Sequence, residues 1–292
     1  MSSLEESVVR RPIGAAAREL GAELRQERLR AEMGTTTVAS SLGWSKAKLS
    51  KLERGWRGTD EWDVGTLLGA YGTDKSIRER LRKLAQRQDE DWLVRDHVGR
   101  RPEELLCWRV HEDLALKIAC YEPLAIPSLL QTENYALGLS GGVAEVGDRI
   151  EPAVEQRFGS RQVLDGSVVP EVAVFIHEIA LRLVVGNETV MHDQLMHLNF
   201  QGDRENLRLR IVPSSAGARC ALRRPGVLMT FVEPLKPLAC LETESAVVFT
   251  EQEQAVAAVR EKFDLLGEVA LGEDASRDVL RYWVDVYDNA SR

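Results

Sequence analysis

The clearest apolar spacing of the chain lies in a short segment on either side of one glycine. Val38 and Leu42 recur at helical spacing before it, and Leu49 and Leu52 do so after it. Gly43, between the two pairs, can adopt the left-handed backbone conformation that ends a helix. The segment therefore predicts two short helices joined by a tight turn.

Ser45 and Gly55 mark the predicted ends of the second helix. The Ser45 hydroxyl can accept hydrogen bonds from the first N–H groups of the helix, and Gly55 can terminate it. A step of about 100° per residue puts Leu49 and Leu52 on the side that packs against the first helix. The opposite side carries basic and small residues. They are Lys46, Ala47, Ser50, Lys51 and Arg54.

A helix with one buried side and one basic side is suited to DNA. The major groove is ~12 Å wide and admits an α-helix, whose early residues reach the base edges. Lys46 lies early enough to donate to guanine O6 and N7, and the Ala47 methyl suits a thymine methyl. Lys48 lies on the flank, where a phosphate contact is expected. A solvated charged face on an ordinary helix pair is the alternative, and Ala39, the Gly43 turn and the Ser45 cap together favour DNA binding.

Three further amphipathic segments complete a helical N-terminal domain. Apolar residues at helical spacing outline one helix before the pair and two after it. They are Ile13, Ala17, Leu20, Leu24 and Ala31 in the first helix, Trp62, Leu67, Leu68 and Tyr71 in the fourth, and Ile77, Leu81, Leu84 and Ala85 in the fifth. We therefore expect an all-α helix-turn-helix domain of five helices over residues 10–98.

Downstream of a short join at Gly99–Pro102, helical periods are mixed with short strand patterns. Helices are expected at Glu103–Ala119, Thr132–Leu139, Ile150–Leu164, Val190–Phe200, Gln252–Leu266 and Ala275–Tyr287. Strands are expected at Glu171–Ile176, Leu207–Val212, Val227–Val232, Ala239–Glu242 and Ala246–Thr250. Short turns between the last three strands predict an antiparallel meander. The pattern predicts an α+β C-terminal domain over residues 102–290 with a small, mainly antiparallel sheet.

Charge is distributed unevenly along the chain. The 292 residues carry a net charge of −8, yet residues 10–58 hold eleven Lys and Arg against five Asp and Glu. Residues 101–292 hold nineteen basic and thirty acidic residues. A chain this acidic should not coat nucleic acid indiscriminately. DNA binding is therefore expected only at the basic N-terminal face, and it should weaken with added salt.

Composition indicates a soluble, cytoplasmic protein that contacts no membrane. No run approaches the ~18 apolar residues of a membrane span, and the first residues lack the apolar core of a secretory signal. The cysteines are far apart with no Cys-x-x-Cys pair, so four reduced, mostly buried thiols are expected rather than zinc ligands. They are Cys107, Cys120, Cys220 and Cys240.

Several strings of the sequence resemble known regulators. The segment LGAELRQERLRAEMGTTTVASSLGWSKAKLSKLERG resembles the Cro/repressor type of helix-turn-helix, the xenobiotic-response-element class. The strings YEPLAIPSLLQTENYA, RFGSRQVL, IHEIALRLVVG, MHDQL and IVPSSAGA resemble the C-terminal domain that accompanies this helix-turn-helix in many actinobacterial, antitoxin-like regulators. The resemblance implies a transcription factor, often encoded beside a small partner protein, whose C-terminal domain has no settled biochemical role.

By position, the resemblance assigns DNA contacts to individual residues. The base-reading positions of the family fall on Lys46, Ala47 and Lys51. Positions nearer the DNA backbone are occupied by Ser45, Ser50 and Arg54. The helix before the turn usually opens with a Thr cap and a Gln that braces a phosphate, whereas Gly34 and Thr35 stand there in this chain. Gly34 can still cap, and Thr35 can still donate to the DNA backbone, so the same docking mode is expected with lower affinity.

The sequence contains no motif for catalysis or metal binding. His177 and Glu178 begin as in HExxH, but Leu181 stands where the second histidine would be. His192 and His197 are about 140° apart around a helix, which does not bring them to one metal. No GxSxG, GxGxxG or GxxxxGK[ST] string occurs. We expect no enzymatic activity, no metal site and no cofactor.

A string of aromatic and apolar residues in the C-terminal domain is the other candidate for function. Glu122 lies within an apolar run, so it is expected to be partly buried and to need a cationic partner such as Arg157 or Arg161. The string is interpreted either as an architectural corner or as a groove for a partner or ligand. Its candidate residues are Tyr121, Glu122, Tyr135 and Arg157.

Together these patterns predict a sequence-specific regulator of transcription that binds double-stranded DNA. Arg57, with Arg54 and Lys48, is expected to hold phosphates. A homodimer on a near-palindromic operator is expected, because one helix-turn-helix buries only ~600–1,000 Å². Two alternatives stay open. One is an antitoxin-like module that binds a small neighbouring-gene product, and the other is a sensor whose C-terminal pocket binds a small-molecule effector.

Overall fold

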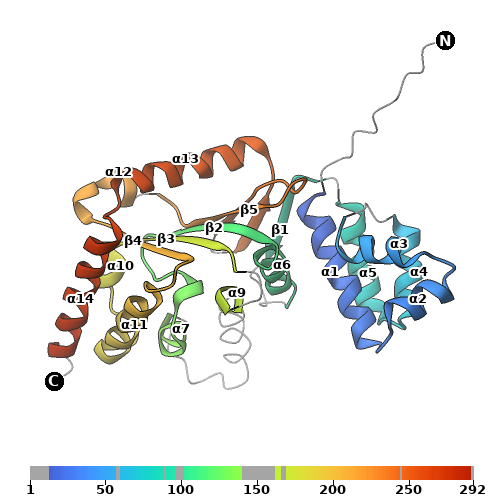
Figure 1. Ribbon diagram of the computed structural model, residues 1–292, viewed down its shortest axis with the longest axis horizontal. Helices are drawn as coiled ribbons and strands as arrows, with labels where there is room; N and C mark the ends of the chain where they lie inside the picture. Colours follow the sequence, from blue (N-terminus) through green and yellow to red (C-terminus); the bar gives the residue numbers. More distant parts are fainter. Residues whose placement is uncertain are drawn as a thin grey trace, which may run out of the picture. The chain divides into compact units, whose positions relative to one another are not determined.

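The computed structural model describes residues 13–56, 60–88, 90–96, 102–139, 162–165, 169–221, 223–243 and 245–290. These residues fall into two compact units. The first unit contains the described residues up to Asp91 together with Val232–Lys236, and the second contains those of Trp92–Phe231 and Pro237–Arg292. Figure 1 shows helices in the first unit and a sheet with helices around it in the second.

Five helices form the described part of the first unit, as the apolar spacing predicts. They are α1 (Ala15–Arg30), α2 (Thr35–Ser41), α3 (Lys46–Glu53), α4 (Glu61–Ala70) and α5 (Lys75–Gln86). Their apolar stripes meet in one core. Its fully buried side chains include Leu20, Leu24, Val38, Leu49, Leu52, Val64, Leu67, Leu68 and Leu81. The expectation of an all-α N-terminal region is confirmed.

The seven strands described in the second unit form one mixed sheet. They are β1 (Trp92–Asp96), β2 (Ala115–Glu122), β3 (Glu171–His177), β4 (Leu207–Val212), β5 (Gly226–Phe231), β6 (Leu238–Glu242) and β7 (Ala246–Thr250), in the order β1-β7-β6-β5-β2-β3-β4. β5, β6 and β7 form the expected antiparallel meander, whereas β2 pairs in parallel with β3, and β3 with β4. The prediction of a small, mainly antiparallel sheet is therefore wrong, because the sheet is larger and mixed.

Two strands do not follow the sequence pattern. The helix expected over Glu103–Ala119 ends early, since α6 spans Pro102–Glu112 and β2 begins at Ala115. β2 lies between β3 and β5 in the middle of the sheet, and a central strand lacks the polar alternation that distinguishes a strand from a helix. The range expected for the N-terminal domain includes β1, but β1 pairs with β7 in the second unit.

Helices lie on both faces of the sheet (Figure 1). One face is covered by α13 (Glu253–Val269), which contacts β5 and β6. The other helices include α7 (Glu133–Leu139), α11 (Glu188–Gln201) and α14 (Glu273–Ala290), which pack together beside β4. These four helices agree with predicted ones. Of the helix expected over Ile150–Leu164, only part of α9 (Gln162–Asp165) falls among the described residues.

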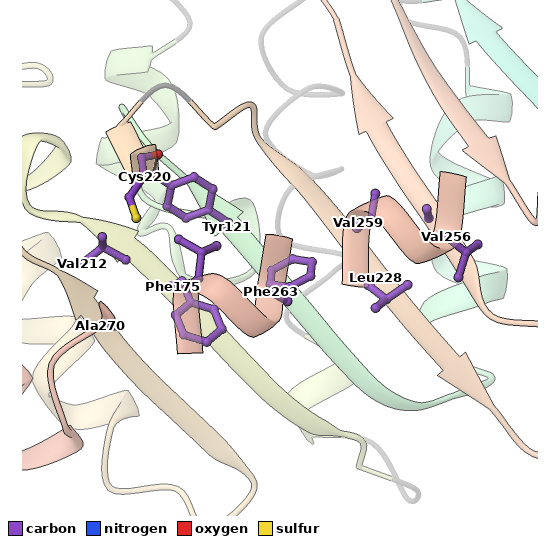
Figure 2. Packing of buried hydrophobic residues seen from close by; sticks show 11 residues of the cluster. Tyr121, Phe175, Val212, Cys220, Leu228, Val256, Val259, Phe263 and Ala270 are labelled. Carbon is purple, nitrogen blue, oxygen red and sulfur yellow. Dashed lines mark hydrogen bonds between the residues drawn. The ribbon is translucent and has the colours of Figure 1, made fainter. Parts of the chain in front are cut away.

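The core under α13 brings together residues that are far apart in the sequence (Figure 2). Phe175 of β3 packs on Phe263 of α13, with 6.1 Å between the ring centroids. Tyr121 and Leu228 from the neighbouring strands belong to the same cluster. These contacts bury the apolar side chains on this face of the sheet in the core.

Three further observations on the described residues concern membrane spans, metal ions and disulfides. Among the described residues, no helix combines the length and apolarity that a membrane span requires. Within that same part of the chain, no group of three or more His, Cys, Asp or Glu side chains is placed to hold a metal ion. All four cysteines are buried thiols that form no disulfide.

Candidate nucleic-acid interface

The turn between α2 and α3 has the geometry that its sequence predicts. α2 ends at Ser41, and Gly43 follows with a φ of 65°, in the left-handed region. The Ser45 hydroxyl accepts a hydrogen bond from the Lys48 N–H at 3.1 Å and so caps α3. Gly55, with a φ of 64°, follows the end of α3. Both ends of α3 are therefore set by residues close to it in the sequence.

A close backbone contact at two glycines holds α3 against α1. A Cβ atom added to Gly21 would lie 2.5 Å from the Gly55 nitrogen, and one added to Gly55 would lie 2.6 Å from the Ala17 carbonyl oxygen. Such separations are shorter than real Cβ contacts, so both positions require glycine. Gly55 thus ends α3 and also allows it to approach α1. The sequence indicates only the first of these roles.

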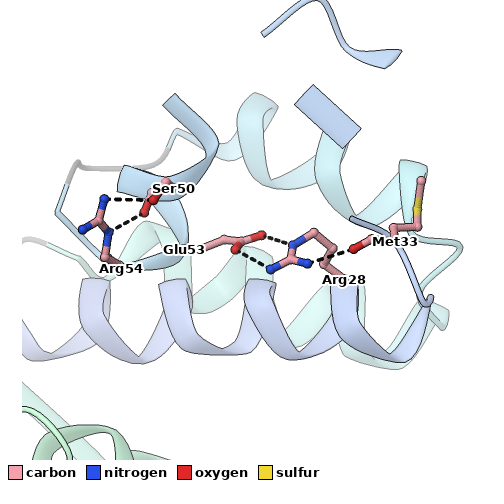
Figure 3. Close-up of polar contacts among 5 residues, drawn as sticks. All are labelled: Arg28, Met33, Ser50, Glu53 and Arg54. Atoms are coloured by element: carbon pink, nitrogen blue, oxygen red, sulfur yellow. Dashed lines mark hydrogen bonds and ion pairs between the residues drawn. The ribbon is translucent and has the colours of Figure 1, made fainter. Parts of the chain in front are cut away.

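A buried ion pair makes a second connection between α1 and α3 (Figure 3). The Arg28 guanidinium donates to the two carboxylate oxygens of Glu53 at 2.6 and 2.9 Å, and to the Met33 carbonyl oxygen at 2.8 Å. Both charged side chains are more than nine-tenths buried. Hydrogen bonding to Glu53 raises the pKa of Arg28, so the guanidinium stays charged. This pair joins the end of α1, the turn before α2 and the end of α3.

The side of α3 opposite its buried leucines is exposed. Its exposed residues are Lys46, Ala47, Lys51 and Arg54, and Ser50 is half-buried. No ion pair within the described part of the chain engages the ammonium group of Lys46 or of Lys51. This side therefore presents three cations, Lys46, Lys51 and Arg54, and the Ala47 methyl group. The C-terminal end of α3 is held by its contacts with α1.

Lys48 does not have the free side chain that a phosphate contact requires. Its Nζ lies 2.7 Å from Asp63 Oδ1 and 3.6 Å from the centroid of the Trp44 ring. Asp63 belongs to the first turn of α4, so the pair connects α3 to α4. Lys48 would have to leave Asp63 to reach DNA, and its present contacts are structural.

Arg54 is held along α3 by two neighbours (Figure 3). Its Nε donates to the Ser50 carbonyl oxygen at 3.1 Å, and its Nη2 donates to the Ser50 hydroxyl oxygen at 2.8 Å. The guanidinium carbon lies 4.8 Å from the centroid of the Trp56 ring, within the range of a cation–π contact. The guanidinium is thereby drawn back toward the preceding turn of the helix.

The remaining DNA candidates are divided between described and undescribed segments. Thr35 is the first residue of α2 and is half-buried, and Gly34 precedes it as an N-cap without a side-chain hydrogen bond. Arg57 lies outside the described residues. The same is true of Arg157, the partner expected for the half-buried Glu122.

The two tyrosines of the C-terminal candidate string are core residues. The Tyr121 hydroxyl donates to the Cys220 carbonyl oxygen at 2.9 Å, and the Tyr135 hydroxyl accepts from the Ile126 N–H at 3.1 Å. Both side chains are completely buried, and burial raises the pKa of each. These contacts support the interpretation of the string as an architectural corner.

His177 and Glu178 also have structural contacts. His177 Nδ1 accepts from the Ile179 N–H at 3.1 Å and caps α10 (Glu178–Arg182), and burial lowers the pKa of the imidazole. A Glu178 carboxylate oxygen accepts from the Ser214 N–H at 2.8 Å, which lowers the pKa of that carboxyl. The two side chains thus stabilise the loops that follow β3 and β4.

Comparisons with known proteins identify both parts of the chain. A family model described as a domain of unknown function, DUF5753, matches residues 108–282, and one described as a helix-turn-helix domain matches residues 19–81. No curated protein matches the chain. Among solved structures, that of TrmBL2, an archaeal chromatin protein reported to show a novel mode of DNA binding, aligns at 13% identity. The alignment covers 77% of this chain and 69% of TrmBL2 with a TM-score of 0.29, which is too low to support an argument.

Proposed function

This chain belongs to the DUF5753 family and carries a helix-turn-helix domain before that domain, and from this premise we propose that it is a sequence-specific, DNA-binding regulator of transcription. The helix-turn-helix domain would bind the operator. The DUF5753 domain would carry the regulatory role.

The observation that carries the proposal is the division of α3 into two sides. Leu49 and Leu52 are fully buried, while Lys46 and Lys51 are exposed without an intramolecular ion pair in the described residues. A recognition helix must keep its angle as it enters the major groove. The contact at Gly55 and the buried ion pair of Glu53 supply this rigidity at the end of α3.

Three residues of α3 would read the operator. Lys46 and Lys51 would donate to guanine O6 and N7, and the Ala47 methyl would contact a thymine methyl. The exposed lysines would also attract the DNA backbone and release counterions from it. Binding should therefore weaken with added salt, which makes that release less favourable. We propose Thr35 and Ser45 as additional contacts to phosphates.

We further propose that the regulator binds as a homodimer. A single helix-turn-helix buries ~600–1,000 Å², whereas useful specificity generally requires more contact area. Two copies related by a two-fold axis would read half-sites about one helical turn apart, roughly 34–36 Å. The operator is then expected to be a near-palindrome.

Selection of bound duplexes from a random pool, with the full chain, tests the proposal. The expected result is a single motif with two inverted half-sites. Lys51→Ala should reduce discrimination at one base pair of each half-site by about 5- to 150-fold. The matched control is Lys75→Ala, which changes another exposed lysine, on α5, and should leave discrimination unchanged. Failure to enrich any motif would contradict the proposal, and an equal loss on all sequences would remove Lys51 from base reading.

A further inference from the structure

Arg54 directly follows α3 as its C-cap residue, on the side about half a turn from the direction of the buried leucines. The resemblance of the sequence puts this position near the DNA backbone. We propose instead that Arg54 reads a guanine of the operator with its terminal nitrogens. This inference rests on the DNA-binding function proposed above and adds a specificity-determining residue to it.

The guanidinium of Arg54 has two edges that carry N–H donors, and they differ in their hydrogen bonds. One edge presents Nε and Nη2, and both of these nitrogens donate to Ser50, through its carbonyl and hydroxyl oxygens. The other edge, formed by Nη1 and the second hydrogen of Nη2, has no hydrogen-bond acceptor among the described residues. Two parallel N–H donors on one edge match the O6 and N7 acceptors of guanine. The free edge is therefore the one suited to a bidentate base contact.

The guanidinium of Arg54 lies nearer the N-terminal end of α3 than the Arg54 backbone does. Arg54 follows the last residue of α3, a place where a side chain that extended outward would meet the DNA backbone. The bonds to Ser50, four residues earlier, draw the charged group back by about one turn (Figure 3). The N-terminal part of a recognition helix lies closest to the base edges. The guanidinium of Arg54 thus lies beside the turn of α3 that contains Lys51, which would read a base.

Two contacts fix the orientation of the Arg54 side chain. Ser50 holds one edge of the guanidinium, and the Trp56 ring lies 4.8 Å from its central carbon. A phosphate accepts a cation from many directions, and a lysine serves it as a point charge. An arginine that reads guanine must place its planar fork in a defined orientation, and holding the fork in advance reduces the entropy lost on binding.

Arg54→Lys separates the two roles, because it keeps the charge and removes the fork. Affinities of the full-length protein are measured for the selected operator and for duplexes that carry every single base-pair change. Arg54→Lys should lose about 5- to 150-fold discrimination at one G·C pair of each half-site. Its affinity for a scrambled duplex, and the dependence of that affinity on salt, should match the wild type. Lys75→Ala, with no change at any base pair, is the control.

The outcomes distinguish this inference from the function on which it rests. If wild-type protein prefers the operator and Arg54→Lys retains the full base-pair profile, the guanine contact is refuted while the regulator function stands. If wild-type protein shows no preference among duplexes, both fail. Thermal unfolding of Arg54→Lys should match the wild type, since the side chain is exposed.

Ser50→Ala tests the positioning of the fork. This change removes the hydroxyl that accepts from Nη2 and leaves the charge of Arg54 in place. Discrimination should fall at the same G·C pair as in Arg54→Lys, by a smaller factor. Full retention at that pair, or a loss confined to a different pair, would show that Ser50 does not position Arg54.

Discussion

Removal of the Glu53 carboxylate should destabilise the first unit more than the loss of any exposed ion pair. Glu53→Gln takes away the counter-charge of Arg28 and at least one of two hydrogen bonds, at 2.6 and 2.9 Å. The Arg28 guanidinium would then be buried with only the Met33 carbonyl oxygen and a neutral amide as partners. Breaking a buried pair on one side costs roughly 3–5 kcal/mol. Because the amide can still accept one hydrogen bond, we expect a loss of about 3 kcal/mol.

Hydrogen exchange followed by mass spectrometry measures this loss in the full chain. Amides of α1 and α3 should exchange roughly 150-fold faster in Glu53→Gln, because each 1.4 kcal/mol is a tenfold change. Peptides from β2 and β3 serve as an internal reference that should not change. Glu61→Gln, which alters an exposed carboxylate 3.3 Å from Arg82, is the matched variant and should exchange as the wild type does. Equal exchange in the two variants would refute a structural role for the buried pair.

Two further predictions concern the glycines around α3 and a histidine of the sheet. Gly43→Ala should cost about 1–2 kcal/mol through its left-handed backbone alone, since no atom lies within 4 Å of the added Cβ. Gly55→Ala should cost clearly more, because its Cβ also meets α1, and similar thermal shifts would contradict this order. The second unit should lose stability as the pH falls below about 6.5, since burial lowers the pKa of His177 and protons then favour the unfolded chain. His177→Asn keeps a capping side chain and should flatten that dependence in urea unfolding, whereas an unchanged slope would assign it to other groups.

The parts of the interface that the sequence predicts are those fixed by local geometry. The Ser45 cap joins residues three apart, and the alternation of buried and exposed sides of α3 follows from the helical period. The left-handed Gly43 likewise requires only its own lack of a Cβ atom. Each of these features could be placed from a few neighbouring residues.

The contacts of the interface that the sequence does not predict join residues that are far apart in the chain. Arg28 is one of several arginines in α1, and nothing local indicates that it meets Glu53, which is 25 residues away. In the sequence, Lys48 is one more cation on the flank of α3, and only the packing of α4 places Asp63 beside it. The contact of Gly21 with Gly55 depends in the same way on the arrangement of two helices.

The sheet shows the same division between local and distant causes. β5, β6 and β7 are joined by short turns, so their antiparallel pairing could be predicted. β2 acquires its strand conformation between β3 and β5, and both partners lie more than fifty residues further along the chain. A run of apolar residues gives no sign of such pairing, so the sequence pattern predicts a helix that continues through β2 as far as Ala119.

The central claim is that the exposed side of α3 reads a defined DNA sequence, and the ratio of two affinities tests it most directly. The Kd of the full chain is measured at about 0.15 M salt for the selected operator and for a scrambled duplex of the same length and composition. We predict that the operator binds at least about a thousandfold more tightly. Equal affinities for the two duplexes would contradict the claim.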